Sequence, residues 1–413
     1  MNDELNGLKS TATGVAAASV TAAATDLRTL INTLCPDGVE WKTVGEVYKR
    51  LRGTPITAHK MQEIANQSGD ITIFAGGKTV VKANSIDIPK LNAINMPAVL
   101  VQSRGVIDFI YYDHPFTFKN EMWAYTSDST ASVKYLYYML KNNVTHFRTE
   151  ASSASSLPQI SIKSTENFRI PVPPLAVQEK IVQILDKFTE LAKELAKEKQ
   201  ARRAQYEYYR DWLLDLAHPE GKQGKVWDLL RTLCPDGVEW KTLGECSEMQ
   251  RGTMLTQKDV VAGDVPVISG GVKPAYYHNT PNRTGETVTV ASSGASSGYV
   301  QYWNQPIYVN DAFSVKGILN LTDTKFLYYY LKNIQPAICA TKIGGGVPHV
   351  RIDGIKNFRI PVPPLPVQAE IVRILDQFST LAEDITTGLP AEIAARQTQY
   401  EYYRNQLLSF KER

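Results

Sequence analysis

Cysteine and histidine are scarce in this chain, which has four cysteines and six histidines among 413 residues. No two cysteines form a Cys-x-x-Cys pair, so the sequence indicates neither a structural zinc site nor a disulfide framework. The histidines show no metal-ligand spacing, and we expect no metal in this chain. Unpaired thiols predict a cytoplasmic protein. The cysteines are Cys35, Cys234, Cys246 and Cys339.

Long apolar runs are also missing, and no segment approaches the roughly 18 residues that a membrane-spanning helix needs. Residues 1–25 are rich in Ala and Thr, but Asp3 and Glu4 stand where a signal peptide would be basic. We therefore interpret residues 1–25 as a weakly ordered tail or a marginal helix, and expect no membrane association. The net charge of +3 permits nucleic-acid binding without arguing for it.

The chain contains the same unit twice. Three segments return almost unchanged and in the same order, and the third of them is Gln-Tyr-Glu-Tyr-Tyr-Arg. The first contains Leu-Cys-Pro-Asp-Gly-Val-Glu-Trp-Lys, and the second is Asn-Phe-Arg-Ile-Pro-Val-Pro-Pro-Leu. The paired ranges are 30–46 with 229–245, 167–175 with 357–365, and 205–210 with 399–404.

The segment after Pro174 predicts a helix of about 40 residues, because apolar residues recur in steps of four and three. Pro173 and Pro174 fix where this helix starts. The second copy repeats the pattern, but Gly388-Leu-Pro390 predicts a kink or break. Two such helices favour an intramolecular coiled coil, although each could instead pack on its own domain. The seam positions are Ile181, Leu185, Phe188, Ala192, Leu195, Tyr206, Tyr209, Leu213 and Leu216, and Ile371, Leu375, Phe378, Ala382, Ile385, Tyr400, Tyr403, Leu407 and Phe410.

The segments between the repeats, residues 47–165 and 247–355, differ from each other. They share little beyond an Arg-Gly-Thr (52–54 and 251–253) and a Tyr-Tyr (137–138 and 328–329). Their β-branched, Gly, Ser and Asn residues predict strands and loops, with one helix near 133–142 and its counterpart near 324–333. Basic residues outnumber acidic ones here, by 14 to 9 between Lys42 and Lys163 and by 10 to 8 between Lys241 and Asp353.

Two motifs resemble catalytic ones but lack a required feature. Pro36-Asp37 with Glu40 and Lys42 contains the residues of a PD…ExK nuclease, yet two intervening residues predict only a Pro-Asp-Gly turn. Gly76-Gly-Lys-Thr79 lacks the upstream Gly of a phosphate-binding loop, so it predicts a turn between strands.

Two further segments deserve the same test. The segment 171–175 lacks the Asn or Asp and the aromatic residue of an adenine methyltransferase motif. The glycines 344–346 and the serine-rich segment 152–156 fit a tight strand crossing and a DNA-facing loop equally well.

The duplicated order of variable segment, Ile-Pro-Val-Pro-Pro-Leu junction and long helix resembles the specificity (S) subunit of Type I restriction–modification enzymes. The similarity covers nearly the whole chain beyond about residue 26. It implies an α+β fold: two mixed α/β target-recognition domains, two long antiparallel helices forming an intramolecular coiled coil, and a pseudo-twofold internal repeat. The expected boundaries are a tail at 1–25, the first recognition domain at 26–166, a helical spacer at 167–217, a linker at 218–226, the second recognition domain at 227–355 and a second spacer at 356–413.

The resemblance also implies a non-catalytic role. Each recognition domain would read half of a split DNA site, and the helices would dock two methyltransferase subunits that recruit motor-nuclease subunits. S-adenosylmethionine, ATP and Mg²⁺ would belong to those partners, with no cofactor in this chain. The alternatives are a DNA-binding scaffold or repressor outside restriction, and a nuclease built on the duplicated Pro-Asp…Glu-x-Lys segments.

Basic and small polar residues of the variable segments are the candidate DNA contacts, because such side chains reach phosphates and base edges. In the first recognition domain they are Thr54, Lys60, Lys78, Thr79, Lys82, Ser103, Arg104 and Lys119. In the second they are Thr253, Lys258, Lys273, Ser292, Ser293, Ser296, Lys316 and Lys342.

Overall fold

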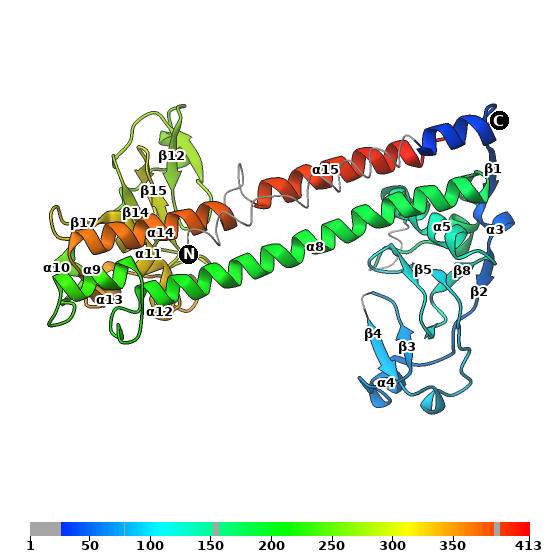
Figure 1. Ribbon diagram of the computed structural model, residues 1–413, viewed down its shortest axis with the longest axis horizontal. Helices are drawn as coiled ribbons and strands as arrows, with labels where there is room; N and C mark the ends of the chain where they lie inside the picture. The colour runs from blue at the N-terminus through cyan, green and yellow to red at the C-terminus, as the bar shows by residue number, and fades with distance from the viewer. Residues whose placement is uncertain (1–25, 78, 152–156, 384–388) are drawn as a thin grey trace. The chain divides into compact units, whose positions relative to one another are not determined.

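The computed structural model describes residues 26–77, 79–151, 157–383 and 389–413. The tail predicted for residues 1–25 lies outside this part of the chain. The residues divide into two compact units (Figure 1). The first unit contains the chain up to Glu194 together with Ala394–Arg413, and the second contains Leu195–Ile393. The first unit thus combines segments from both repeats.

Two of the repeated motifs are partners in a small sheet. Strand β1 (Glu40–Thr43) pairs antiparallel with β9 (Arg169–Val172), and β10 (Trp240–Thr242) pairs antiparallel with β18 (Arg359–Pro361). Each sheet has only two strands, so both are edge strands. An edge strand tolerates a proline, because the missing N–H group is not needed to bond a further strand. The two motifs recur together because each is the pairing partner of the other.

The first recognition domain contains two further sheets. One is four-stranded and antiparallel in the order β2-β8-β5-β6, and the other has the order β4-β3-β7, in which β3 and β7 are parallel. The strands are β2 (Lys49–Leu51), β3 (Ile71–Phe74), β4 (Val80–Ala83), β5 (Ala98–Gln102), β6 (Asp108–Tyr112), β7 (Phe116–Phe118) and β8 (Trp123–Thr126).

The second recognition domain repeats this topology strand for strand. Its four-stranded sheet has the order β11-β17-β14-β15, and its three-stranded sheet has the order β13-β12-β16, with β12 and β16 parallel. The predicted strand-rich domains and internal repeat are therefore confirmed. The strands are β11 (Ser247–Arg251), β12 (Val265–Ile268), β13 (Tyr276–His278), β14 (Thr287–Ala291), β15 (Val300–Trp303), β16 (Tyr308–Val309) and β17 (Ala312–Gly317).

Shorter helices follow the same duplication. The two predicted helices are confirmed as α5 (Thr130–Asn142) and α11 (Thr324–Asn333), whose N-caps are Ser129 and Asp323. The other helices are a segment at 26–34, α3 (Val44–Val47), α4 (Ala58–Glu63), η1 (Ser85–Asp87), α6 (Val144–Glu150), α7 (Ile162–Glu166), α9 (Lys225–Leu233), α10 (Leu243–Cys246), η2 (Gln257–Asp259), α12 (Gln335–Ala340) and α13 (Ile352–Ile355).

The long helix predicted after the prolines is confirmed as α8 (Leu175–Leu214), with 40 residues. The second copy is described as α14 (Leu365–Glu383) and α15 (Leu389–Leu407). Gly388 of the predicted interruption lies outside the described residues, whereas Pro390 lies in the first turn of α15, where proline is tolerated.

The long helices pair within each unit through the predicted seam residues. In the first unit the Phe188 ring of α8 stacks on the Tyr403 ring of α15, with centroids 5.6 Å apart. The pair is antiparallel, because Glu412, just beyond α15, binds Arg169, just before α8. In the second unit the rings of Tyr209 and Phe378 stack at 5.0 Å.

A polar contact fixes each recognition domain to a long helix. In the first unit the Tyr138 hydroxyl of α5 donates to the Asp186 carboxylate of α8 at 2.6 Å, and Lys134 binds the same carboxylate. Burial, together with that carboxylate, raises the pKa of Tyr138 and keeps its hydroxyl protonated. The second unit repeats the contact between Tyr329 and Asp376 at 2.5 Å. The shared Tyr-Tyr therefore serves the junction between domain and helix.

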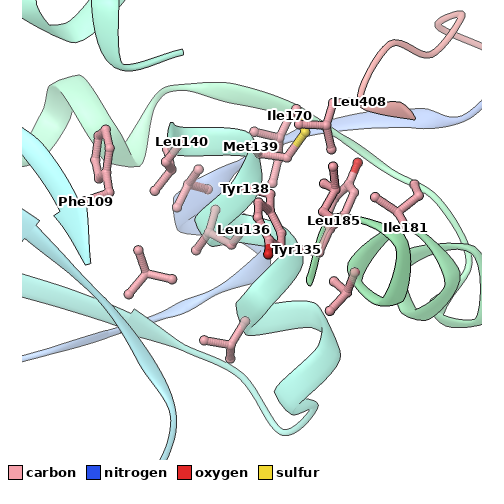
Figure 2. Close-up of a cluster of buried hydrophobic side chains, with 14 of the residues drawn as sticks. Phe109, Tyr135, Leu136, Tyr138, Met139, Leu140, Ile170, Ile181, Leu185 and Leu408 are labelled. Atoms are coloured by element: carbon pink, nitrogen blue, oxygen red, sulfur yellow. The ribbon is translucent and has the colours of Figure 1, made fainter. Parts of the chain in front are cut away.

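The main core of the first unit lies where these elements meet. Figure 2 shows Tyr135 of α5 on the side of Ile181 and Leu185 of α8, with Leu136 on the other side of α5, and Ile170 of β9 belongs to the same core. All five side chains are buried. The duplicated junction and the long helix thus share one hydrophobic core with the recognition domain.

Residues 215–224 connect α8 to α9, and the predicted linker 218–226 overlaps the first two residues of α9. The Lys222 ammonium group donates to the carbonyl oxygens of Trp212 and Asp215 at 3.2 and 2.8 Å. It also lies 4.5 Å from the centre of the Trp227 ring, a cation–π contact. These bonds cap the C-terminal end of α8, where a cation is favourable.

No helix in the described part of the chain is long and apolar enough to cross a membrane. The four cysteines are free thiols, and burial raises the pKa of the Cys246 thiol to about 11.

Candidate nucleic-acid interface

The nuclease-like segments form turns followed by strands, as predicted. Gly38 has a φ of +100° in the Pro-Asp-Gly turn before β1. The carboxylate of Glu40 pairs with the ammonium group of Lys42 at 2.8 Å on the exposed edge of β1. Glu239 and Lys241 form the equivalent pair in the second copy. Among the described residues, no group of three or more His, Cys, Asp and Glu could hold a metal ion.

The Gly76-Gly77 segment is confirmed as a turn between strands β3 and β4. Gly77 has a φ of +75°, a conformation that favours glycine. Thr79 is exposed beyond the turn, and Lys78 lies outside the described residues.

Two predicted contacts in the first recognition domain are buried. Thr54 is 0% exposed, and its hydroxyl bonds to that of Thr117 at 2.7 Å. Ser103 is 1% exposed and donates to the carbonyl oxygen of Glu121. Their hydroxyl groups serve the domain's interior and cannot reach DNA in this conformation. We therefore correct the prediction for both residues and leave them out of the interface.

The other described candidates of the first domain lie at the surface. Lys60 pairs with Glu63 at 2.8 Å, and Lys119 pairs with Glu121 at 2.9 Å. Contact with a phosphate would require these lysines to leave their carboxylates. The other three candidates are exposed, with no ion pair among the described residues: Thr79, Lys82 and Arg104.

Most second-domain candidates are also accessible. The ammonium groups of Lys316 and Lys342 donate to the carbonyl oxygens of Thr284 and Ala295. The Ser293 hydroxyl bonds to the Asp311 carboxylate. Ser292 and Ser296 are partly buried, and three candidates are exposed: Thr253, Lys258 and Lys273.

A short two-stranded contact, which we call the clip, brings several of these residues together. In the first domain, residues 103–105 after β5 run beside residues 158–160. The Gly105 amide donates to the Pro158 carbonyl at 2.8 Å, and the Ile160 amide donates to the Ser103 carbonyl at 3.0 Å. Arg104 and Gln159 lie opposite each other in an antiparallel bridge.

The second domain builds the same clip after β14. The Gly294 amide donates to the Pro348 carbonyl at 3.1 Å, and the Val350 amide donates to the Ser292 carbonyl at 2.9 Å. Ser293 lies opposite His349 in the bridge. The two clips therefore have identical hydrogen bonding.

The two faces of each clip differ in exposure. In the first domain Ser103 and Ile160 are 1% and 3% exposed, whereas the intervening Arg104 and the neighbouring Gln159 are exposed. Successive residues of an extended strand point to opposite faces, and directly opposite residues share one face. The first clip thus presents one exposed cross-strand pair on a buried support, whereas in the second clip Ser292, Ser293 and His349 are all partly buried above Val350.

A groove of about 430 Å³ lies beside the clip of the second domain. The guanidinium groups of Arg251 and Arg351 on its wall take part in no ion pair among the described residues. Free guanidinium groups in a groove are suited to phosphate oxygens and to guanine edges. The groove also contains Ser292, Asn310, Asp311 and His349.

The glycine loop 344–346 rises from the second clip, closed by two hydrogen bonds of 2.9 Å between Ile343 and His349. A side chain added at Gly345 or Gly346 would meet no atom within 4 Å. Of the two interpretations left open, the tight strand crossing does not hold at Gly345 and Gly346, whereas a side chain at Gly344, where φ is +102°, would lie 3.0 Å from the Val347 carbonyl oxygen. The serine-rich segment 152–156 lies outside the described residues.

The candidate interface also includes five residues that the sequence did not place among the predicted contacts: Arg52, Arg251, Gln159, His349 and Arg351. Two signals could have identified them. The Arg of each Arg-Gly-Thr is one of the few residues that the variable segments share. Leu-Pro-Gln159 and Val-Pro-His349 occupy equivalent places ahead of the repeated junction.

Comparison with known proteins gives one consistent family. The family described as Type I restriction modification DNA specificity domain matches residues 36–202 and 235–395. The chain is 29% identical over 414 residues to the EcoR124I/EcoR124II specificity subunit of Escherichia coli, covering 90% of this chain and 94% of that protein. It is 30% identical over 303 residues to a putative type I restriction enzyme specificity subunit of Haemophilus influenzae, covering 67% of this chain and 72% of that protein.

Solved structures share the fold. The type I restriction–modification S subunit of M. genitalium superposes with a TM-score of 0.61 at 19% identity, over 90% of this chain and 97% of that chain. A chain from a study of complex assembly and conformational transition in the type I system superposes with a TM-score of 0.50 at 15% identity, over 90% and 98% of the two chains.

Proposed function

From the premise that the chain belongs to the Type I restriction modification DNA specificity family, we propose that its two recognition domains each read one half of a split DNA site. As the specificity subunit it recognises sequence, and the chemistry belongs to other subunits. The two domains share a topology but differ in surface residues, which fits an asymmetric site with two unlike halves.

The observation that carries this proposal is the pair of clips. Both have the same backbone hydrogen bonds, while the outward residues are Arg104 and Gln159 in one and Ser293 and His349 in the other. A protein that binds one ligand twice would keep the outward residues alike. A protein that reads two sequences needs the same support with different side chains.

The residues shared by both domains are suited to what both half-sites share, the phosphate backbone. Arg52 and Arg251 occupy equivalent exposed positions before the structural glycines. Phosphate contacts carry no sequence information, so two different readers can use the same residue for them. The proposed interface also contains Thr79, Lys82, Thr253, Lys258, Lys273 and Arg351.

The long helices provide the other proposed surface. We propose that α8 and the pair α14 and α15 dock two methyltransferase subunits, which in turn recruit motor-nuclease subunits. S-adenosylmethionine, ATP and Mg²⁺ would bind to those partners, in the cytoplasm. The likeness to the chain from the type I assembly study supports the fold on which this docking depends.

Mapping of methylated adenines tests the proposal. The chain, reconstituted with its methyltransferase subunits, would modify unmethylated genomic DNA in the presence of S-adenosylmethionine. We expect a motif of two defined parts separated by an undefined gap. Exchange of residues 247–355 for the corresponding segment of a relative should alter one part and leave the other unchanged. A single contiguous motif, or a change in both parts, would contradict the proposal.

A further inference from the structure

The clip has the same cross-strand hydrogen bonds in both recognition domains, and its outward pairs differ. We infer that the clip determines which bases each domain selects, through Arg104 and Gln159 in the first domain and through Ser293 and His349 with the neighbouring Asp311 in the second. The inference rests on the proposed function and names the residues that carry its specificity. It goes beyond general DNA binding, because it assigns base types.

The backbone of the clip does not depend on the outward pair. Gly105 and Gly294 have φ values of +76° and +80°, a conformation that other residues rarely adopt. Arg104 and Ser293 directly precede these glycines. Their partners Gln159 and His349 directly follow Pro158 and Pro348. The glycines and the four cross-strand hydrogen bonds therefore hold either pair in the same position.

The support beneath the first clip is rigid. Ser103 donates to the Glu121 carbonyl at 2.7 Å, and the Glu121 carboxylate is itself paired with Lys119. Gln102 donates to the Gly77 carbonyl at 2.7 Å. Because these partners are already engaged, Arg104 and Gln159 are the side chains of this clip that remain available.

The outward pair of the first domain consists of a strong donor and an amide. Arginine recognises guanine through O6 and N7, and glutamine recognises adenine through N6 and N7. Arg104 takes part in no ion pair among the described residues, and both side chains are exposed on one face. The first half-site therefore contains a guanine read by Arg104 and an adenine read by Gln159.

The second domain has different chemistry at the same place. No arginine belongs to its outward pair, and the Ser293 hydroxyl binds the Asp311 carboxylate. Asp311 lies in the groove beside His349 and takes part in no ion pair among the described residues. A carboxylate in the major groove accepts a hydrogen bond from the amino group of cytosine. Asp311, held by Ser293, therefore reads a cytosine in the second half-site.

Exchange of the outward pairs tests this inference. The double variant Arg104→Ser with Gln159→His, and the reciprocal Ser293→Arg with His349→Gln, would each be assembled with methyltransferase subunits and used to map methylated adenines. We expect each variant to lose preference at one or two positions of one half-site, by roughly 10- to 100-fold, and to keep the other half-site. His114→Ala, an exposed residue of the first domain outside the clip, is the matched control and should leave the motif unchanged.

A conservative variant separates base reading from charge. Arg104→Lys keeps the positive charge but replaces the planar guanidinium fork with a single ammonium group on a flexible stem, which fits guanine O6 and N7 less well. It should relax the guanine preference while the affinity for DNA that lacks the recognition site, which depends on charge, stays unchanged. The thermal midpoint of every variant would be compared with that of the unaltered chain, because a folded variant that has lost only specificity supports a reading role.

The outcomes distinguish the two levels of argument. An unaltered complex without a two-part motif would overturn the proposed function. An unaltered complex with such a motif, together with folded exchange variants that methylate the same motif at the same rate, would overturn the inference about the clip alone. If an exchange variant methylates nothing, the Arg104→Lys result decides: an unchanged guanine preference overturns the inference.

Discussion

Single residues explain why a few positions are shared between two otherwise different domains. A side chain at Gly53 would lie 2.0 Å from the Phe118 carbonyl oxygen, and one at Gly252 would lie 2.0 Å from the Asn310 carbonyl oxygen. At both places the chain leaves its four-stranded sheet and passes against the three-stranded sheet. The shared Arg-Gly-Thr is therefore a packing requirement, to which an exposed arginine is attached.

The substitution Gly252→Ala tests this requirement. The added methyl group would overlap backbone atoms that cannot move without disturbing both sheets, so we expect a loss of about 2–4 kcal/mol of unfolding free energy. Urea denaturation of the full chain measures it. Gly345→Ala is the matched control, since that position is open, and it should change stability by less than about 0.5 kcal/mol. Equal effects in both variants would refute the packing explanation.

At the scale of elements, an ion pair joins the helix at the start of each repeat to the long helix of the same repeat, and the two copies use different residues for it. In the first unit the segment 26–34 meets α8 through Asp26 and Lys180, 3.3 Å apart. In the second unit α9 meets α14 at the equivalent place through Lys225 and Glu370, 3.0 Å apart, with the charges exchanged. The exchange means that each lead-in helix suits the long helix of its own copy.

Glu370 makes this contact dependent on pH. Its side chain is only 6% exposed. Hydrogen bonds from Arg373 and Lys225 lower the pKa of the carboxyl group, although burial acts in the opposite direction. A carboxyl group whose pKa is lower in the folded than in the unfolded state stabilises the protein at pH values above its unfolded pKa, which is about 4.3 for glutamate. This stabilisation is lost as the pH falls through the folded pKa. We expect Glu370→Gln to cost about 1–2 kcal/mol at pH 7, and the difference from the unaltered chain to shrink towards pH 3.

Denaturation curves at pH 7, 5, 4 and 3 measure that difference. Asp228→Asn, in an exposed ion pair with Arg231, is the control and should show a much smaller effect at pH 7. A cost of Glu370→Gln that stays constant down to pH 3 would show that the ionised carboxylate is not its source.

At the scale of the whole molecule, affinity for DNA and choice of sequence are assigned to different residues. Arg52 of the first domain and Arg251 of the second are equivalent residues that we propose bind phosphates, whereas the outward pairs of the clips differ between the domains. The net charge of +3 on 413 residues is small for a DNA-binding protein, so individual phosphate contacts should matter.

Combined replacement of Arg52 and Arg251 by alanine tests this division. Each lost phosphate contact should make the dependence of binding on salt shallower by roughly 0.9 in log–log slope. The assembled complex would be titrated with DNA at several salt concentrations, and its methylated motif would be mapped. We expect weaker binding with an unchanged motif. An altered motif would assign these arginines to base reading instead.

The sequence by itself determined the duplication, the topology class and the family. Repeats, proline junctions and a period of 3.5 residues are local properties, so they predicted the start of α8 to within one residue and located α5 and α11. The same local patterns excluded the nuclease-like and phosphate-loop interpretations through spacing alone.

Only the tertiary structure decided which polar residues face outward. Thr54 and Ser103 are residue types that often contact DNA, yet their hydroxyl groups form hydrogen bonds inside the domain. Gln159 and His349 became candidates because residues more than 50 positions earlier pair with them. Burial and cross-strand pairing depend on contacts between distant segments, which no local pattern contains.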